Sequence, residues 1–416
     1  MKAAACLAAL LLACHAPPEE TGDPLDTGDP GVQPTTGCEG DEAALREMIA
    51  GPEPTSAEVQ ALLAQVDAGC GWPIVSEAGT FLFARVGGSG TWAVAGDFDD
   101  WGGTPLTSHG ALQWADLTIP SPADAGYKFT DGAAWEADPW ARRLVYDEYG
   151  ELSLVRAERA HLERWRSFAA EGLRARTVRV WVPDGGVFDR VLFAHDGQNL
   201  FDPQASYGGW HLQDALPSGM LVVANDNTPD RMEEYTHVED LLHGEWYGGW
   251  GATYGAFVQE QLRPWADEQY GSADHFGLLG SSLGGLISLS IADQYPGEWD
   301  FAASLSGTLG WGSIGAHNET MIERYAAAGH RDTALYLDSG GYGTTCADTD
   351  DDGIDDDDPD SADNYCETVQ MRDTLEAGGY VFEEDLWHWW EPDAAHNEAA
   401  WAARVALPLS VFAALE

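Results

Sequence analysis

The stretch Phe276–Leu286, which reads FGLLGSSLGGL, decides the fold of this chain. Its first residues predict a buried strand, and Leu283 to about Tyr295 predicts a helix. Between them, residues 280–284 match G-x-S-x-G, in which a serine stands on a strained strand-to-helix turn. The two glycines are needed because a Cβ at either position would clash with neighbouring backbone. The helix that follows points its positive end at a developing oxyanion, so we predict that Ser282 is a nucleophile.

Length and charge limit what the protein can be. The 416 residues allow two domains, one of them a sizeable α/β core. There are 20 basic and 70 acidic residues, a formal net charge of −50, which argues against nucleic acid and anionic lipid headgroups as partners. Some of the 18 Trp could stack on sugars or aryl groups, although core and rim packing accounts for most.

The start of the chain has the features of an export signal. Residues 1–13 combine a positive start with an apolar run too short to span a membrane, which predicts a signal peptide. The run ends in LLAC and resembles a bacterial lipobox with Cys14 as the lipidated residue. Residues 14–37, rich in Pro, Gly, Asp and Thr, predict a flexible acidic linker. We therefore expect an outer-membrane or cell-surface lipoprotein, membrane-bound only through its lipid; a periplasmic or secreted protein is the alternative.

An exported chain permits disulfides, and four cysteines are left after Cys6 and Cys14. Cys38 and Cys70 bracket two helical patterns, 41–49 and 55–66, so we predict a disulfide-stapled helical hairpin over 38–72. Cys346 and Cys366 are the other natural pair.

Residues 74–157 change to short strands and turns, which predicts an all-β sandwich. The order of G-x-F-x-x-W, Y-K-F and D-G-x-W before D-P resembles early-set modules related to glycogen-binding domains. In sugar-binding members two Trp and a Lys line the glycan groove, and the matching positions are Trp101, Lys128 and Trp135. Other modules of this kind only pack beside a catalytic domain.

Residues 159–416 alternate strands with helices, which predicts a mostly parallel sheet covered on both faces. The strands are expected at 161–168, 177–182, 191–194, 220–224, 276–280, 301–305, 333–337 and 380–387. The helices are expected at 251–270, 283–295 and 367–377, with a final one from Asn397.

Several motifs of this region recur together in one known group. They are HDGQNLFD at 195–202, the run 227–235 with Arg231, GSSLGG at 280–285, and AHNEAAW at 395–401. In this order they resemble the esterase D-like α/β-hydrolases, which include enterochelin, feruloyl and acetylxylan esterases and mycolyltransferases. The early-set module ahead of the hydrolase is also the layout of enterochelin-type esterases. The resemblance implies an α/β-hydrolase domain and a carboxylic ester hydrolase without an organic cofactor.

The resemblance also implies roles for single residues. Ser282 is the nucleophile, and His396, late in the chain, is the general base; His388 is its competitor. The amide of Leu283 is one oxyanion donor, and the second comes from Gly197 or Gln198. Gln198 and Trp210 could instead contact substrate or brace that loop.

The triad acid departs from the family pattern. No acid follows the glycines after strand 333–337 until Asp348. Asp338 is our first choice because it stands at the strand's carboxyl end, and Asp348, Asp360 and Asp363 remain open.

An acidic insertion, 346–366, fills this region. Residues 348–356 fit D-x-D-x-D-G-x-x-D, the start of a calcium loop, and resemble a thrombospondin type 3 repeat. The predicted Ca²⁺ ligands are listed in chain order: Asp348, Asp350, Asp352, the Ile354 carbonyl and Asp356. A solvated acidic loop is the alternative.

Together these features predict an extracytoplasmic serine esterase acting on a carbohydrate ester or siderophore-type ester through an acyl-enzyme. An acyltransferase of the same fold is the first alternative. A non-catalytic, calcium-stabilised glycan- or surface-binding lipoprotein is the second.

Overall fold

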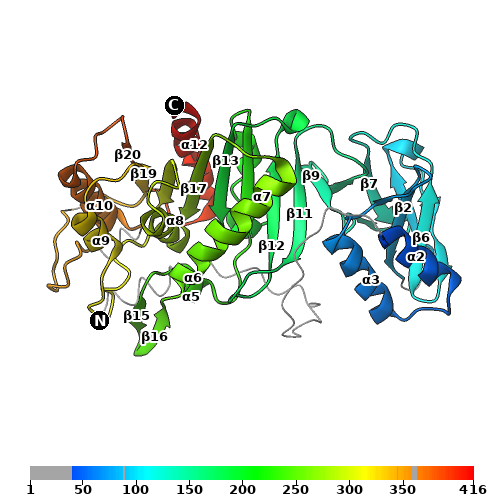
Figure 1. Cartoon of the computed structure of the whole chain (residues 1–416), viewed down its shortest axis with the longest axis horizontal. Coiled ribbons are helices and arrows are strands. Elements are labelled where there is room, and N and C mark those ends of the chain that lie inside the picture. The colour runs from blue at the N-terminus through cyan, green and yellow to red at the C-terminus, as the bar shows by residue number, and fades with distance from the viewer. Residues whose placement is uncertain (1–39, 88–89, 344, 358–362) are drawn as a thin grey trace. The chain divides into compact units, whose positions relative to one another are not determined.

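The computed structural model describes residues 40–87, 90–343, 345–357 and 363–416. The predictions for residues 1–37 and for Cys38 and Asp360 therefore lie outside the described residues. The chain forms two compact units (Figure 1): the smaller holds described residues 40–169 and 175–187, the larger 170–174 and 188–416. Within the described residues, no helix has the length and apolar character that crossing a membrane requires.

The smaller unit begins with the two predicted helices. They are α2 (Asp41–Ala50) and α3 (Ser56–Ala68). Thr55 accepts from the Glu58 amide, while the Glu58 carboxylate accepts from the Thr55 amide at 2.7 Å, so a capping box starts α3. Cys70, which follows α3, is disulfide-bonded.

Two sheets of the smaller unit enclose a common core, as a β-sandwich requires. One has the order β1-β2-β6-β5, with β1 (Ile74–Val75), β2 (Phe81–Val86), β6 (Leu112–Leu117) and β5 (Thr107–His109). The other runs from β4 (Thr104–Pro105) through β3 (Ala93–Gly96), β7 (Gly126–Thr130), β10 (Gly150–Leu154), β9 (Arg143–Asp147) and β11 (His161–Phe168) to β12 (Arg176–Val182). The short β8 (Trp135–Glu136) pairs with β7.

Strand β2 shows why its first four residues, 81–84, are all apolar. Phe81 and Phe83 point into the core between the sheets, where Tyr127 and Phe129 of β7 also lie. Leu82 and Ala84 point the other way, into a second cluster formed with α2 and α3. Because successive strand residues face opposite sides, a strand buried on both faces reads as a continuous apolar run.

The larger unit contains six parallel strands in the order β20-β19-β18-β17-β13-β14. Their bounds are β13 (Arg190–His195), β14 (Met220–Asn225), β17 (His275–Ser281), β18 (Phe301–Leu305), β19 (Ala334–Ser339) and β20 (Leu386–Trp390). Strand β14, the next strand in the chain after β13, lies on one side of β13. The later strands, from β17 to β20, are added on its other side. In such sheets the functional site lies outside the carboxyl ends of the strands at this switch point, here β13 and β17.

Helices cover both faces of this sheet. Figure 1 shows α7 (Arg263–Tyr270) crossing in front of the strands and α12 (Ala406–Ala414) behind them. Phe412 of α12 stacks on Phe301 of β18 with centroids 5.3 Å apart. The other helices are α4 (Leu212–Ala215), α5 (Arg231–Glu234), α6 (Gly251–Ala256), a π-helical turn (Phe257–Leu262), α8 (Leu283–Gln294), α9 (Met321–Ala328), α10 (Tyr365–Gly378) and α11 (Glu398–Arg404).

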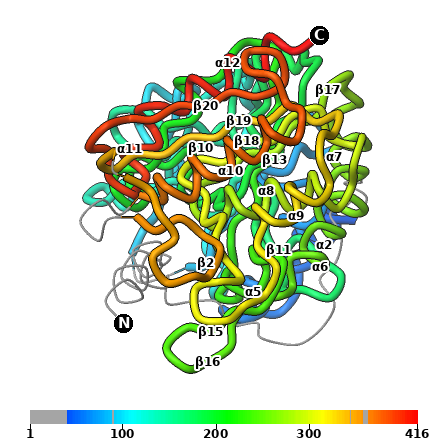
Figure 2. Tube along the Cα trace, turned by 90° about the vertical axis from the view of Figure 1, so that its left-hand side faces the viewer, coloured from blue at the N-terminus to red at the C-terminus, as the bar shows by residue number. Residues whose placement is uncertain are grey.

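Two elements differ from the sequence-based expectation. The last strand begins at Leu386 rather than at 380, because the amides of Asp385 and Leu386 both donate to the Val381 carbonyl and close a turn there. A hairpin of β15 (Glu239–Leu242) and β16 (Glu245–Gly248), which we did not predict, projects from the body of the unit (Figure 2). The buried Asp240 carboxylate anchors it by accepting from four amides between Gly312 and Ala316, at 2.8 to 3.1 Å.

Gly280→Ala tests whether the strand-to-helix turn needs its glycine. A Cβ at Gly280 would stand 2.4 Å from the Gly284 backbone, so we expect a loss of about 1–3 kcal/mol in unfolding free energy and of most activity. Gly378→Ala is the matched control, because its Cβ would meet nothing closer than 3.6 Å. Chemical denaturation measures both; equal stability of the two variants would contradict the expectation.

Candidate active site

Ser282 occupies the turn that its sequence predicts. Its backbone has φ 55° and ψ −126°, a conformation that L-residues rarely adopt. The Ser282 amide donates to Leu305 of β18 at 2.9 Å, and its carbonyl accepts from the amides of Gly285 and Leu286. These bonds hold the strained residue at the carboxyl end of β17 and at the start of α8.

The predicted oxyanion donors stand at two helix starts on neighbouring strands. Leu283 is the first residue of α8, and Gly197 and Gln198 begin a 3-10 turn, Gly197–Asn199, that follows β13. The first amides of a helix have no partner within it, so these N–H groups are available to an anion. Strands β13 and β17 are adjacent, which brings the two helix starts to one edge of the sheet.

The residue before this 3-10 turn is fixed by an ion pair. Asp196, at φ 58°, binds Arg231 through two hydrogen bonds of 2.8 Å and accepts from Asn227 at 2.6 Å. Burial alone would raise the pKa of Asp196, but Arg231 and Asn227 outweigh it and hold the pKa below its usual value. Gln198 braces the loop by accepting from the Asn227 amide at 3.0 Å, while its buried Nε2 finds no partner among the described residues.

His396 is held by Asp363. Its Nδ1 lies 2.6 Å from Asp363 Oδ1, and both side chains are almost fully buried. A carboxylate can only accept, so Nδ1 carries the proton and Nε2 is left as a base. Trp401 packs edge-on against the imidazole, 5.0 Å between centroids, and fixes the ring plane.

The acid position corrects our first choice. Asp338 does stand at the end of β19, but its carboxylate accepts from Arg404 at 2.9 Å and from the Tyr336 hydroxyl at 3.3 Å. Burial raises the pKa of Asp338 to about 6, with Arg404 opposing the rise. Asp363, one of the residues left open, is the carboxylate that contacts His396.

Two residues that sequence reasoning missed join these groups. Ser306, just past β18, donates to Asp363 Oδ2 at 2.8 Å, and Arg404 Nη2 donates to Ser306 Oγ at 2.6 Å. Arg404 also reaches Asp363 at 3.4 Å, so its single positive charge is shared between two buried carboxylates. An arginine inside the apolar run from Ala399 to Leu409 was the available signal, because such a charge is buried only with a partner.

The remaining predicted residues have distinct surroundings. His388, the competing base, lies within β20 opposite Leu337, and burial lowers its pKa to about 4. In the smaller unit Trp101 and Trp135 meet with ring centroids 5.8 Å apart. Lys128 is largely buried and donates to the Tyr149 carbonyl at 3.1 Å, so its ammonium is already engaged.

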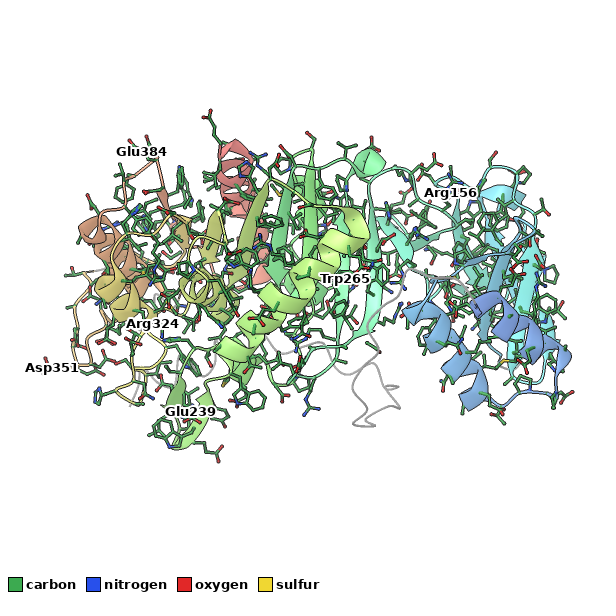
Figure 3. The ribbon with its side chains drawn as sticks, in the orientation of Figure 1. Arg156, Glu239, Trp265, Arg324, Asp351 and Glu384 are labelled. Atoms are coloured by element: carbon green, nitrogen blue, oxygen red, sulfur yellow. A yellow bond between two sulfur atoms is a disulfide. The ribbon has the colours of Figure 1, made fainter. Side chains whose placement is uncertain are left out.

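The acidic insertion brings three of its predicted ligands together. Carboxylate oxygens of Asp348, Asp350 and Asp352 lie within 4.8 Å of one another. Asp356 accepts instead from the Thr349 amide at 2.9 Å. Burial and the two neighbouring carboxylates raise the pKa of Asp352. The predicted Cys346–Cys366 disulfide is present, and Figure 3 shows Asp351 at the outer margin of this segment.

A parallel sheet with a serine on a strained turn, a late histidine and a buried acid defines an α/β-hydrolase fold of the serine hydrolase type. The chain belongs to the family described as "Putative esterase", whose model matches residues 172–406, more than half of the chain. A curated relative, the uncharacterized protein YbbA of Bacillus subtilis (strain 168), is 30% identical over 134 residues. That match covers 30% of this chain and 52% of the relative, so the chain spans about half the length of the relative it matches.

Three solved structures are similar to this chain over much of its length. The enterobactin esterase of Shigella flexneri, crystallised with enterobactin, is 15% identical with a TM-score of 0.42, covering 80% of this chain and 93% of that one. An IroE-like serine hydrolase of Shewanella oneidensis is 17% identical with a TM-score of 0.46, covering 62% and 82%. The siderophore hydrolase EstA of Aspergillus nidulans is 16% identical with a TM-score of 0.45, covering 60% and 94%.

Asp363→Asn and Asp338→Asn separate the two buried acids. Asparagine at 363 would donate to His396 and favour the wrong tautomer, so we expect kcat to fall about 10³–10⁴-fold. Asp338→Asn breaks a buried ion pair and should cost on the order of 3–5 kcal/mol of stability, with kcat kept within about tenfold. Steady-state kinetics and thermal unfolding of both variants distinguish the two acids. A larger loss of kcat from Asp338→Asn than from Asp363→Asn would restore Asp338 as the acid.

Proposed function

We propose that this protein is a serine esterase that hydrolyses a carboxylic ester through a Ser282 acyl-enzyme. The observation that carries the proposal is the buried Asp363–His396 pair in the same unit as a serine held at φ 55° at the end of β17. Membership in the esterase family supports it.

The mechanism follows from the proton positions. Ser282 Oγ attacks the ester carbonyl while His396 Nε2 takes its proton, and the imidazolium then protonates the departing alcohol oxygen. The amides of Leu283 and of Gly197 or Gln198 stabilise the oxyanion, because they stand at the neighbouring helix starts. Water repeats the sequence on the acyl-enzyme with His396 as the base, which releases the acid and restores Ser282.

The proposed substrate is a carbohydrate ester or a siderophore-type ester. The early-set resemblance and the Trp101–Trp135 pair favour a sugar, since a pyranose face stacks on an indole. The charge of −50 disfavours an anionic catecholate siderophore. Acyl transfer to an alcohol instead of water is the first alternative, and a non-catalytic binding lipoprotein is the second. We also propose that Cys14 carries the lipid that places the enzyme at the cell surface.

Single and double substitutions test the nucleophile and the base. Ser282→Ala should lower turnover of p-nitrophenyl acetate at least about 10⁴-fold, His396→Ala should match it, and the double variant should be little worse, because the pair acts as a unit. A serine-directed phosphonate should add to the wild type but not to Ser282→Ala. His388→Ala is the control and should keep its turnover. Hydrolysis that survives Ser282→Ala within a few-fold would reject the assignment, and addition of alcohol acceptors distinguishes transfer from hydrolysis.

We propose in addition that the insertion binds Ca²⁺. Three carboxylates within 4.8 Å suit a hard cation, and without one their charges repel. Asp348, Asp350 and Asp352 would hold the ion, with the Ile354 carbonyl completing the set. The ion would take no part in bond making. It would order the insertion 346–366, which contains Asp363.

Chelation tests the ion. Removing Ca²⁺ should lower kcat more than it raises KM and should lower Tm, because the loop that presents Asp363 would open. Ca²⁺ should restore both, and Mg²⁺ less, since it requires a tighter octahedron. Calorimetric titration of desalted protein reports binding separately from activity, with Asp350→Asn as the variant and Asp373→Asn, on exposed α10 surface, as its control. Unchanged kcat and Tm after chelation, with no calcium by elemental analysis, would leave a solvated acidic loop.

A further inference from the structure

Two buried side chains connect the oxyanion loop to the helix that follows His396. Asn199, the last residue of the 3-10 turn after β13, donates from Nδ2 to Glu398 Oε1 at 3.0 Å. Glu398 is the first residue of α11 and stands two residues after His396. Asn199 is 7% exposed and Glu398 1% exposed, so water cannot readily satisfy either side chain.

The other ends of these two groups lack partners. Asn199 Oδ1 and Glu398 Oε2 are both buried, and neither has a hydrogen-bond partner among the described residues. Both are acceptors if Glu398 is ionised, and two unsatisfied buried acceptors are costly. A protonated carboxyl would remove the problem, because its O–H would donate to Asn199 Oδ1 while its carbonyl oxygen accepts from Nδ2. Two planar groups then pair through two parallel hydrogen bonds.

The surroundings of Glu398 favour the neutral form. Burial raises the pKa of Glu398 to about 7, and the nearby Asp196 carboxylate adds to the rise. The amide of Glu398 itself and Arg231 act in the opposite direction but do not cancel it. Arg404, on the same helix, is committed to Asp338, Ser306 and Asp363.

We propose that Glu398 is a positioning residue that works as a carboxylic acid: paired with Asn199 through both oxygens, it fixes the loop of the oxyanion donors against the turn that carries His396. The proposal rests on the proposed esterase function. Glu398 touches neither substrate nor reacting atoms; it acts through the backbone of Gly197–Asn199 and of His396.

Ionisation of Glu398 should therefore lower activity and stability together. The carboxylate would lose the hydrogen bond to Asn199 Oδ1. Two acceptor oxygens, Glu398 Oε2 and Asn199 Oδ1, would then face each other and repel, which would loosen the loop Gly197–Asn199. Because oxyanion donors act mainly in the transition state, kcat should fall more than KM changes. The folded-state pKa lies above the unfolded value near 4.5, so the folded form binds more protons, and stability should fall as pH rises from about 4.5 through 7.

Glu398→Gln tests the proposal, because the glutamine amide can make both hydrogen bonds at every pH: its oxygen accepts and its NH2 group donates, with no proton to be taken up from solvent. The ratio of its kcat to that of the wild type should rise about fivefold between pH 6 and pH 9, the equivalent of one hydrogen bond. Its Tm should match that of the wild type at pH 5 and exceed it by about 2–4 °C at pH 9. Glu376→Gln, on the exposed face of α10, is the matched control and should shift neither profile.

Glu398→Leu and Asn199→Leu complete the design. Each should lower kcat at every pH, and the double variant should be no worse than either, because they remove one pair. Parallel Tm and kcat profiles of Glu398→Gln and wild type, or a Glu398→Gln loss equal to that of Glu398→Leu, would overturn the proposal. The Tm comparison needs no substrate: an inactive wild type would defeat the esterase function alone, and the acid–amide pair would then be tested by the Tm profiles.

Discussion

The Asp363 carboxylate is fully buried, and the protein gives it four donors in place of water. They are His396 Nδ1, Ser306 Oγ, the Gly340 amide and Arg404 Nη2. Each comes from a different place: the turn before α11, the end of β18, the end of β19 and the end of α11. A buried charge tolerates the loss of few such partners, so helix α11 and two strand ends must be in place before His396 is oriented.

The charge of this cluster is suited to catalysis. Asp338 and Asp363 contribute two negative charges and Arg404 one positive charge, with all three side chains almost inaccessible. The cluster therefore has one negative charge too many while His396 is neutral, and the imbalance is removed when His396 takes the proton of Ser282. The fixed charges stabilise the imidazolium without rearranging, which is how preorganised electrostatics lower a barrier. Asp338, which we first chose as the acid, contributes by holding Arg404 in position.

The sequence predicted those elements whose structure depends on residues close together in the chain. The turn at Ser282, the strands β11 and β18 and the helix that follows Thr55 were each predicted from a stretch of about a dozen residues. The acid was not predictable in this way, because Asp363 and Ser306 are 57 positions apart and their contact is not a periodic pattern. The β15–β16 hairpin was missed for the same reason: its anchor, Asp240, accepts from amides more than 70 positions away. Apolar periodicity reports which residues are buried, and it does not report which buried polar groups meet.

The two halves of the site are held by different means. Ser282 and the oxyanion amides belong to β17, β13 and the helix starts behind them, so the hydrogen-bond ladders of the sheet fix their positions. Asp363 comes from an insertion whose described residues form no strand of the sheet to position it. Side-chain hydrogen bonds and a disulfide hold it instead. Asn364 donates to the Ser306 and Gly307 carbonyls at 3.0 and 3.1 Å, and the Cys346–Cys366 disulfide closes the segment. Conditions that act on the insertion therefore reach the acid first, and they leave the nucleophile and the oxyanion donors in place.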